Sequence, residues 1–152
     1  MAIDQALRCT GAAQFVDGKL MNYGTATVDH TGTIEQRLNS FYNALNRLVK
    51  LSKPDVVVME DIQEQYSVST FKTLAYVQAI VYLYCAQNGI SVDVMSPSHW
   101  RKVLGGGFGR KRDEQKAHAI KLVKDEYRFD VESDVADAIG IHKRKQEVKR
   151  PR

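Results

Sequence analysis

The sequence predicts one α/β domain in which helices flank a mixed five-stranded sheet. Three observations support this fold class. Strand-like segments fill the first third of the chain, a helical apolar repeat starts at residue 34, and short apolar strands alternate with helical segments from residue 55 onward. A chain of 152 residues can bury a core without disulfides or a structural metal. We expect the domain to cover 1-145 and a basic tail to cover 146-152.

Three strands are expected before the first helix. Residues 1–8 are apolar at their start, and segments 12–16 and 20–28 flank the Asp17-Gly18 pair. This pair is a strong signal for a two-residue turn between antiparallel strands. The sequence therefore predicts a β-hairpin centred on the pair.

The next segment predicts an amphipathic helix. Its apolar residues recur from Ile34 to Leu48 at alternating intervals of four and three, and Thr33 with Gln36 fits a capping box. The β-branched run that follows, over 55–59, is typical of a central strand buried on both faces.

The second half of the chain alternates helical segments with one strand and several connections. Residues 71–87 are apolar nearly all round, so this helix should be buried or face a partner subunit. The further elements expected are a helix end at Asn88-Gly89, a strand over 90–95, a short helix over 96–104, a connector over 105–109, a helix over 113–127, and a last helix capped by Ser133 and running to about 145.

The net charge of +4 is unevenly distributed. Residues 129–141 contain four acids and no basic residue, whereas 101–128 and 142–152 each carry a net charge of +5. Basic segments suit a polyanion such as nucleic acid, because Lys and Arg displace its condensed counterions. Acids between them would repel phosphate unless divalent cations neutralise them. The plainer alternative is a solvated helix end beside a basic tail.

The two cysteines, Cys9 and Cys85, lie 76 positions apart and form no metal-ligand spacing with the four histidines. This usage is typical of a reducing compartment and argues against a zinc site. No apolar stretch is long enough to span a membrane, and no leader-like segment opens the chain. We therefore expect a cytoplasmic protein that does not enter a membrane.

Four acids stand where chemistry could converge. Asp4 ends the first expected strand, Glu60 ends the central strand, and Asp134 with Asp137 lies on one face of the last helix. Sites in open α/β sheets form beyond the carboxyl ends of strands. If the two strands are neighbours, the four carboxylates meet, and two divalent ions would offset their repulsion. Acids at strand ends and in the first turn of a helix are also common without any function.

The residues around these acids resemble the motifs of RuvC-type Holliday junction resolvases. The matching segments are 3–11 around the first acid, 57–60 around the second, 105–116 as a glycine loop leading to a lysine-bearing helix, and 133–139 as the closing Asp-x-x-Asp-Ala motif. They occur in the family's order and cover nearly the whole chain. Gln5-Ala6 replaces the family's Pro-Gly and the first strand is short, which favours a divergent, phage-borne member.

The resemblance implies an RNase H-like fold and a homodimer that binds four-way DNA junctions or other branched DNA and nicks two strands symmetrically. It also implies dependence on Mg²⁺, with Mn²⁺ as a substitute. The acidic metal ligands carry over as Asp4, Glu60, Asp134 and Asp137.

The resemblance also assigns roles around the scissile phosphate. Asp4 and an Asp of the last helix are expected to hold the ion that activates water. Asp4 with Glu60 would hold a second ion at the leaving 3′ oxygen, so that the product carries a 5′ phosphate. The catalytic basic residue maps to Lys116 and a second basic residue to Lys102.

DNA contacts are expected mainly from Lys and Arg side chains to phosphates. The candidates are Arg101, Lys102, Arg110, Lys111, Arg112 and Lys116, together with the tail. Tyr66 and Phe71 are candidates for stacking on unpaired bases at the crossover, although a residue such as Phe71 more often lies in a core. A dimer face is expected on the 71–87 helix, at Tyr76, Ile80, Leu83 and Tyr84.

Three alternatives remain open from the sequence alone. The same acids suit a broader structure-selective nuclease or an RNase H-like ribonuclease. A non-catalytic nucleic-acid-binding module could keep the fold and the charges, although all four acids are present. A fragment of an actin-like sugar kinase is the third, but no GxxxxGK[ST] or GxGxxG phosphate loop occurs in the sequence.

Overall fold

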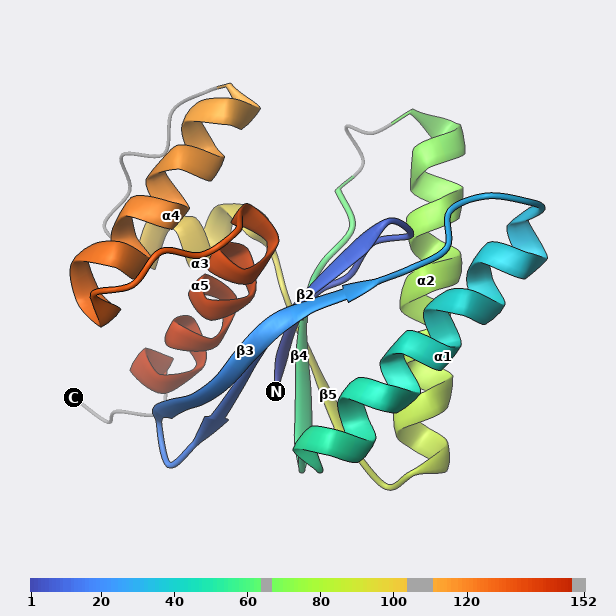
Figure 1. The fold of residues 1–152 in the computed structure, drawn as a ribbon, viewed down its shortest axis with the longest axis horizontal. Helices are drawn as coiled ribbons and strands as arrows, with labels where there is room; N and C mark the ends of the chain where they lie inside the picture. Colours follow the sequence, from blue (N-terminus) through green and yellow to red (C-terminus); the bar gives the residue numbers. More distant parts are fainter. Residues whose placement is uncertain (64–66, 104–110, 149–152) are drawn as a thin grey trace.

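A mixed five-stranded sheet forms the centre of the molecule (Figure 1). The fold comes from a computed structural model that describes residues 1–63, 67–103 and 111–148. The strands are β1 (Ala2–Asp4), β2 (Cys9–Val16), β3 (Lys19–Thr27), β4 (Val56–Glu60) and β5 (Ser91–Met95). Their order is β3-β2-β1-β4-β5, with β1, β2 and β3 antiparallel and with β4 and β5 parallel to β1. The predicted mixed sheet is confirmed.

Helices cover both faces of this sheet (Figure 1). One face carries α1 (Ile34–Ser52) and α2 (Val68–Gln87), and the other carries α3 (Pro97–Val103), α4 (Arg112–Tyr127) and α5 (Ser133–Val148). Helix α5 continues three residues past its expected end at 145. The expected connector over 105–109 and residues 149–152 of the expected tail lie outside the described residues. Within the described ranges, no helix has the length and apolar character needed to cross a bilayer.

The local sequence signals produce the turns and helix ends that they predict, with one exception. Asp17 and Gly18 both have positive φ, 48° and 81°, as the two-residue hairpin requires. Both hydrogen bonds of the Thr33–Gln36 capping box are present.

The exception is Ser133, which does not cap α5. The backbone N–H of Ala136 donates to the carbonyl of Glu132 at 3.0 Å, which makes Glu132 the N-cap residue and Ser133 the first residue of the helix. The Ser133 hydroxyl instead forms hydrogen bonds with the side chains of Lys116 and Asp134.

Alternation along the central strands separates the apolar packing on one face of the sheet from that on the other. Val57 and Met59 of β4, with Ile3 of β1, pack among apolar residues of α1 and α2. The opposite face of these strands packs beneath α3 and α5, in a cluster made of Ala2, Val58, Trp100 and Ile141. Because residues two apart in a strand share a face, Asp4 and Glu60 project to the side of α5. The prediction of a central strand buried on both faces is confirmed.

Helix α5 begins in direct contact with strand β2. Gly11 of β2 has no room for a side chain, since a Cβ there would overlap the backbone carbonyl of Asp134 and lie 2.8 Å from the nitrogen of Val135. The missing side chain lets the first turn of α5 rest on the sheet. Gly11 therefore fixes where the two acids of this helix stand.

We expect Gly11→Ala to destabilise the protein by about 2 kcal/mol or more, because the clash involves backbone atoms that cannot rotate away. Urea unfolding measures the change. Gly24→Ala on neighbouring β3 is the matched control, since a Cβ there meets no described atom within 4 Å. Equal stability of the two variants would show that α5 does not depend on the close approach.

Candidate active site

Two strand ends and one helix meet at the carboxyl edge of the sheet. The parallel register pairs Ile3 with Met59, so the next residues, Asp4 and Glu60, end side by side. On α5, Asp137 lies four residues before Ile141, which packs against these same two strands. The expectation that the first and central strands are neighbours is confirmed, and this pairing brings Asp4 and Glu60 to the same end of the sheet.

The charges of the acids act on one another. Burial raises the pKa of Asp4 well above its usual value, and the negative charges of Asp137, Glu60 and Asp134 raise it further, while Lys116 opposes them. Burial also raises the pKa of Asp137 to about 6, with Glu60 as the next largest cause. Asp4 therefore lies within range of the charges of the other three predicted acids, and Asp137 within range of those of Glu60 and Asp134.

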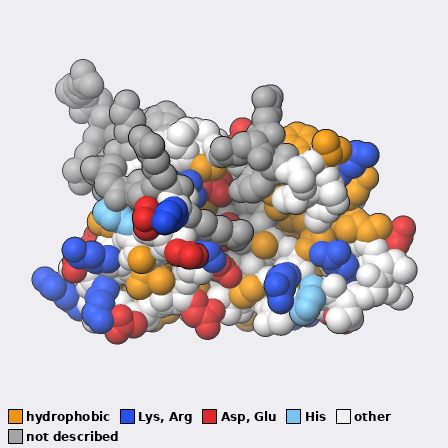
Figure 2. Space-filling view, turned by 90° about the horizontal axis from the view of Figure 1, so that it is seen from above, with side chains coloured by type: hydrophobic (Ala, Val, Ile, Leu, Met, Phe, Trp, Pro, Cys, Tyr) orange, Lys and Arg blue, Asp and Glu red, His pale blue; other side chains and the backbone are white. Residues whose placement is uncertain are grey.

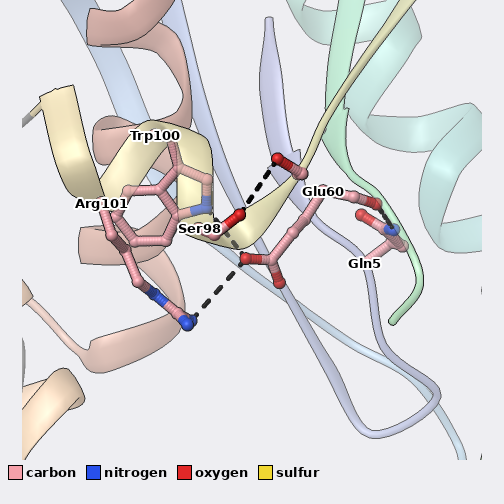
Figure 3. A network of polar contacts seen from close by, with 6 residues as sticks. Gln5, Glu60, Ser98, Trp100 and Arg101 are labelled. Atoms are coloured by element: carbon pink, nitrogen blue, oxygen red, sulfur yellow. Dashed lines mark hydrogen bonds and ion pairs between the residues drawn. The ribbon is translucent and has the colours of Figure 1, made fainter. Parts of the chain in front are cut away.

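Glu60 is held by three contacts (Figure 3). Its Oε1 accepts a hydrogen bond of 2.9 Å from Nε1 of Trp100 and lies 3.7 Å from Nη2 of Arg101. Its backbone carbonyl accepts a bond of 2.6 Å from Nε2 of Gln5. Burial raises the pKa of Glu60, whereas the Trp100 bond and the Arg101 charge lower it. The pKa of Glu60 is raised overall, because the Trp100 hydrogen bond and the Arg101 charge do not fully offset the loss of water on burial.

Asp134 has a basic partner of its own. Nζ of Lys116 on α4 donates to Oγ of Ser133 at 3.0 Å and lies 3.6 Å from Oδ1 of Asp134. The Ser133 hydroxyl donates in turn to the same Oδ1 at 3.1 Å. This short network places an ammonium group at the edge of the acidic cluster.

The donor set fits hard divalent cations, because all of its charged ligands are carboxylate oxygens that repel one another without a counter-charge. In the part of the chain that the structure describes, however, no three His, Cys, Asp or Glu side chains are arranged so that they could hold one ion. Glu60 and Asp134 are instead turned toward Arg101 and Lys116. The carboxylates that a divalent ion needs are present, and the side chains of Arg101 and Lys116 lie beside two of them.

Of the predicted basic and aromatic residues, Lys116 and Arg101 lie at the site. Lys111 is exposed at the start of α4, and Phe71 is 39% exposed in the first turn of α2, so Phe71 is not part of the buried core. The other predicted contacts lie outside the described side chains or residues, namely Lys102, Arg112, Arg110 and Tyr66.

Sequence reasoning missed three side chains of the site. Arg101, expected as a contact to DNA phosphates, lies beside the acid Glu60. Trp100 and Gln5 were not expected at the site. One signal could have found the first two. Strand β5 pairs with β4 up to Glu60, so the helix that follows β5 must start near the same strand ends.

The sheet order and the acids at the ends of β1 and β4 and on α5 define an RNase H-like domain of the nuclease class. The family profile described as "Crossover junction endodeoxyribonuclease RuvC" matches residues 1–142. The chain belongs to this family. A relative from Dictyoglomus thermophilum is 27% identical over 80% of this chain and 77% of its own. One from Corynebacterium diphtheriae is 28% identical over 93% of this chain and 89% of its own.

Solved structures share the fold at low sequence identity. Thermus thermophilus RuvC in complex with Holliday junction substrate superposes with a TM-score of 0.76, at 14% identity, over 97% of this chain and 94% of that chain. The Fowlpox virus resolvase, solved with Holliday junction DNA, has a TM-score of 0.56, at 14% identity, over 97% of this chain and 99% of that chain. The expected RNase H-like fold is confirmed.

The raised pKa of Asp137 predicts a pH-dependent stability of the metal-free protein. A carboxyl whose pKa rises from 3.8 to about 6 on folding contributes stability below its unfolded pKa, and this stability is lost as the pH rises through about 6. Asp137→Asn removes a charge that burial disfavours most and that Glu60 also repels, so we expect it to raise Tm at pH 7.5 by about 5 °C. The gain should narrow as the pH falls below 6.

Thermal unfolding in a chelating buffer measures this effect. Asp125→Asn, which changes an exposed acid of α4, is the control and should leave Tm nearly unchanged. A gain in the Asp137→Asn protein that is the same at pH 5 and pH 7.5 would contradict the account.

Proposed function

We propose that this chain resolves four-way DNA junctions by paired, symmetric, Mg²⁺-dependent nicks, and that the domain over residues 1-145 carries the activity. Membership of the crossover junction endodeoxyribonuclease family makes the protein a metal-dependent nuclease of branched DNA. The observation that carries the proposal is the meeting of four acids from three elements, Asp4 of β1, Glu60 of β4, and Asp134 with Asp137 of α5.

The proposed metal ligands divide into two groups around Asp4. Asp4 with Asp134 or Asp137 of α5 would hold one ion, and Asp4 with Glu60 a second. Bound divalent ions in such pairs activate a water and stabilise the leaving 3′ oxygen of a phosphodiester. Mg²⁺, with Mn²⁺ as a substitute, suits these oxygen ligands. The products would carry 5′ phosphates.

The cations of the site are placed to stabilise the charge that develops on the phosphate. Lys116 points its ammonium group into the acidic cluster from α4, and Arg101 does so from α3. Both donors are held in position before the substrate arrives, which lowers the reorganisation needed at the transition state. Lys111, Arg112, Arg110 and Lys102 would bind more distant phosphates, and Phe71 and Tyr66 would stack on unpaired bases.

A homodimer supplies the second active site that paired nicks require. Figure 2 shows hydrophobic side chains gathered at its right-hand side, over α1 and α2. On α2, Tyr76 is 49% exposed and Leu83 61% exposed. Ile80, expected in the same face, is half-buried against the core between α1, α2 and the sheet. Tyr84, also expected there, is 4% exposed and donates its hydroxyl to Asn46, so its inclusion was wrong. The proposed dimer face therefore runs along the exposed side of α2.

We expect Glu60→Gln to slow Mg²⁺-dependent nicking of a four-way junction by at least about 100-fold, because the neutral amide loses the charge that a divalent ion needs. Asp61→Asn is the matched control. Asp61 is an exposed neighbour of Glu60, and its carboxylate accepts a hydrogen bond of 2.9 Å from the backbone N–H of the next residue, Ile62. Labelled junctions report the cut positions and the end groups.

The same assay separates the alternatives when it includes a fork, a flap and an RNA–DNA hybrid. Equal cleavage of forks and flaps would indicate a broader structure-selective nuclease, and cleavage of the hybrid a ribonuclease. Junction binding without nicking in Mg²⁺ or Mn²⁺ would indicate a non-catalytic module. Native-rate cleavage by the Glu60→Gln protein would refute the assignment of the site.

We expect Leu83→Glu to convert the dimer to a monomer, because it places a charge in an apolar interface. Sedimentation velocity at micromolar concentration measures the change, and cruciform plasmid should then be nicked in one strand rather than linearised. Leu51→Glu, at an 83% exposed leucine in α1, is the control and should stay dimeric. A wild-type protein that is a monomer while it binds junctions would remove the dimer from the proposal.

A further inference from the structure

We propose that Trp100 is a positioning residue for Glu60, whose indole N–H fixes one carboxylate oxygen and so sets the direction in which Glu60 offers its other oxygen to a divalent ion. This inference rests on the proposed function, because it concerns the orientation of one of the proposed metal ligands. It assigns a role to a side chain that is too deeply buried to reach the substrate.

Trp100 is held rigidly at the junction of the elements that carry the acids. Its side chain is fully buried, with 0% exposure, and is the largest such side chain among the described residues. It packs against Ala2 of β1, Val58 of β4 and Ile141 of α5. Each of these neighbours lies two or four residues from one of the acids Asp4, Glu60 and Asp137. The ring therefore cannot shift without displacing a strand or the helix.

The one polar atom of this buried ring is directed at the site. A buried indole N–H requires an acceptor, and here the acceptor is Oε1 of Glu60 at 2.9 Å. The guanidinium of Arg101 lies 5.0 Å from the centre of the Trp100 ring and 3.7 Å from the same Oε1. Both partners act on Oε1, so neither occupies Oε2 (Figure 3).

Glu60 is also fixed through its backbone. Nε2 of Gln5, a residue only 7% exposed, donates to the Glu60 carbonyl at 2.6 Å. The residue after β1 holds the main chain of Glu60, and α3 holds its carboxylate, so little rotamer freedom is left in the side chain. Partners that orient a metal ligand in this way raise metal affinity and activity, typically by 10-fold to 100-fold.

The test compares Trp100→Phe, which keeps an aromatic ring but removes the N–H, with Tyr84→Phe. The second variant also deletes one hydrogen bond of a core aromatic, the 2.8 Å bond to Asn46, but on the opposite face of the sheet. We expect Trp100→Phe to bind Mn²⁺ about tenfold more weakly, as measured by the paramagnetic resonance of free Mn²⁺. Its kcat should fall with little change in KM for the junction, and Tyr84→Phe should match the wild type.

The intrinsic fluorescence of the wild-type protein gives an independent readout, because Trp100 is the only tryptophan in the chain. Titration with Mg²⁺ should change the indole emission, since the charge on its hydrogen-bond acceptor is then partly neutralised. The Glu60→Gln protein should show no such change. If Trp100→Phe does not fold, this titration alone decides the proposal.

The outcomes distinguish a failure of the proposed function from a failure of the positioning role of Trp100. A wild-type protein that binds no Mn²⁺ would overturn the proposed function, and this inference with it. A wild-type protein that binds Mn²⁺, with a Trp100→Phe variant of equal affinity and kcat or with unchanged indole emission on binding, would overturn only the positioning role. In the Glu60→Gln background, Trp100→Phe should cause no further loss of Mn²⁺ affinity, and an additional loss would contradict the inference.

Discussion

The burial of carboxylates that also repel one another is the constraint that the rest of this structure has to satisfy. Charges gathered in a partly buried site oppose folding, as the raised pKa of Asp4 and of Asp137 shows. Apolar packing next to the acids offsets this cost. The cluster made of Ala2, Val58, Trp100 and Ile141 ties β1, β4 and α5 together, one pleat or one helical turn away from the acids. The positions of the carboxylates are thus set by the residues beside them in the sequence.

Two basic side chains also offset the negative charge of the acids. Arg101 and Lys116 both come from the basic segment 101–128, which accounts for a strongly basic segment directly before the acidic one. Each reaches a carboxylate at 3.6–3.7 Å, so the cluster is partly neutralised without any bound ion. The same two groups are suited to a phosphate, because guanidinium and ammonium ions are its usual partners. The charge pattern that looks contradictory in the sequence is therefore consistent in space.

The sequence was sufficient for the parts of the site that depend on periodicity. Strand period and helix spacing place Asp4, Glu60 and Asp137 on facing surfaces once β1 and β4 are neighbours. It was insufficient where two distant segments touch. The need for Gly11 arises only because α5 crosses β2 at that residue, and the Trp100–Glu60 bond joins residues 40 positions apart. The exposed side of α2 was also predicted wrongly at Tyr84, which is buried. A helix that is apolar all round has no periodic signal that shows which side faces the core.

Gln5 joins the ends of the two strands that carry Asp4 and Glu60. It stands where the resembled motif has proline, and its side-chain amide bonds the Glu60 carbonyl at the point where the β1–β4 ladder ends. Its Oε1 is buried without a hydrogen-bond partner among the described residues, which costs about 1–3 kcal/mol. A surface-facing residue at this position would avoid that cost but would leave the two strand ends untied. The buried amide of Gln5 therefore helps to hold Asp4 and Glu60 at a fixed separation, at the cost of one unsatisfied oxygen.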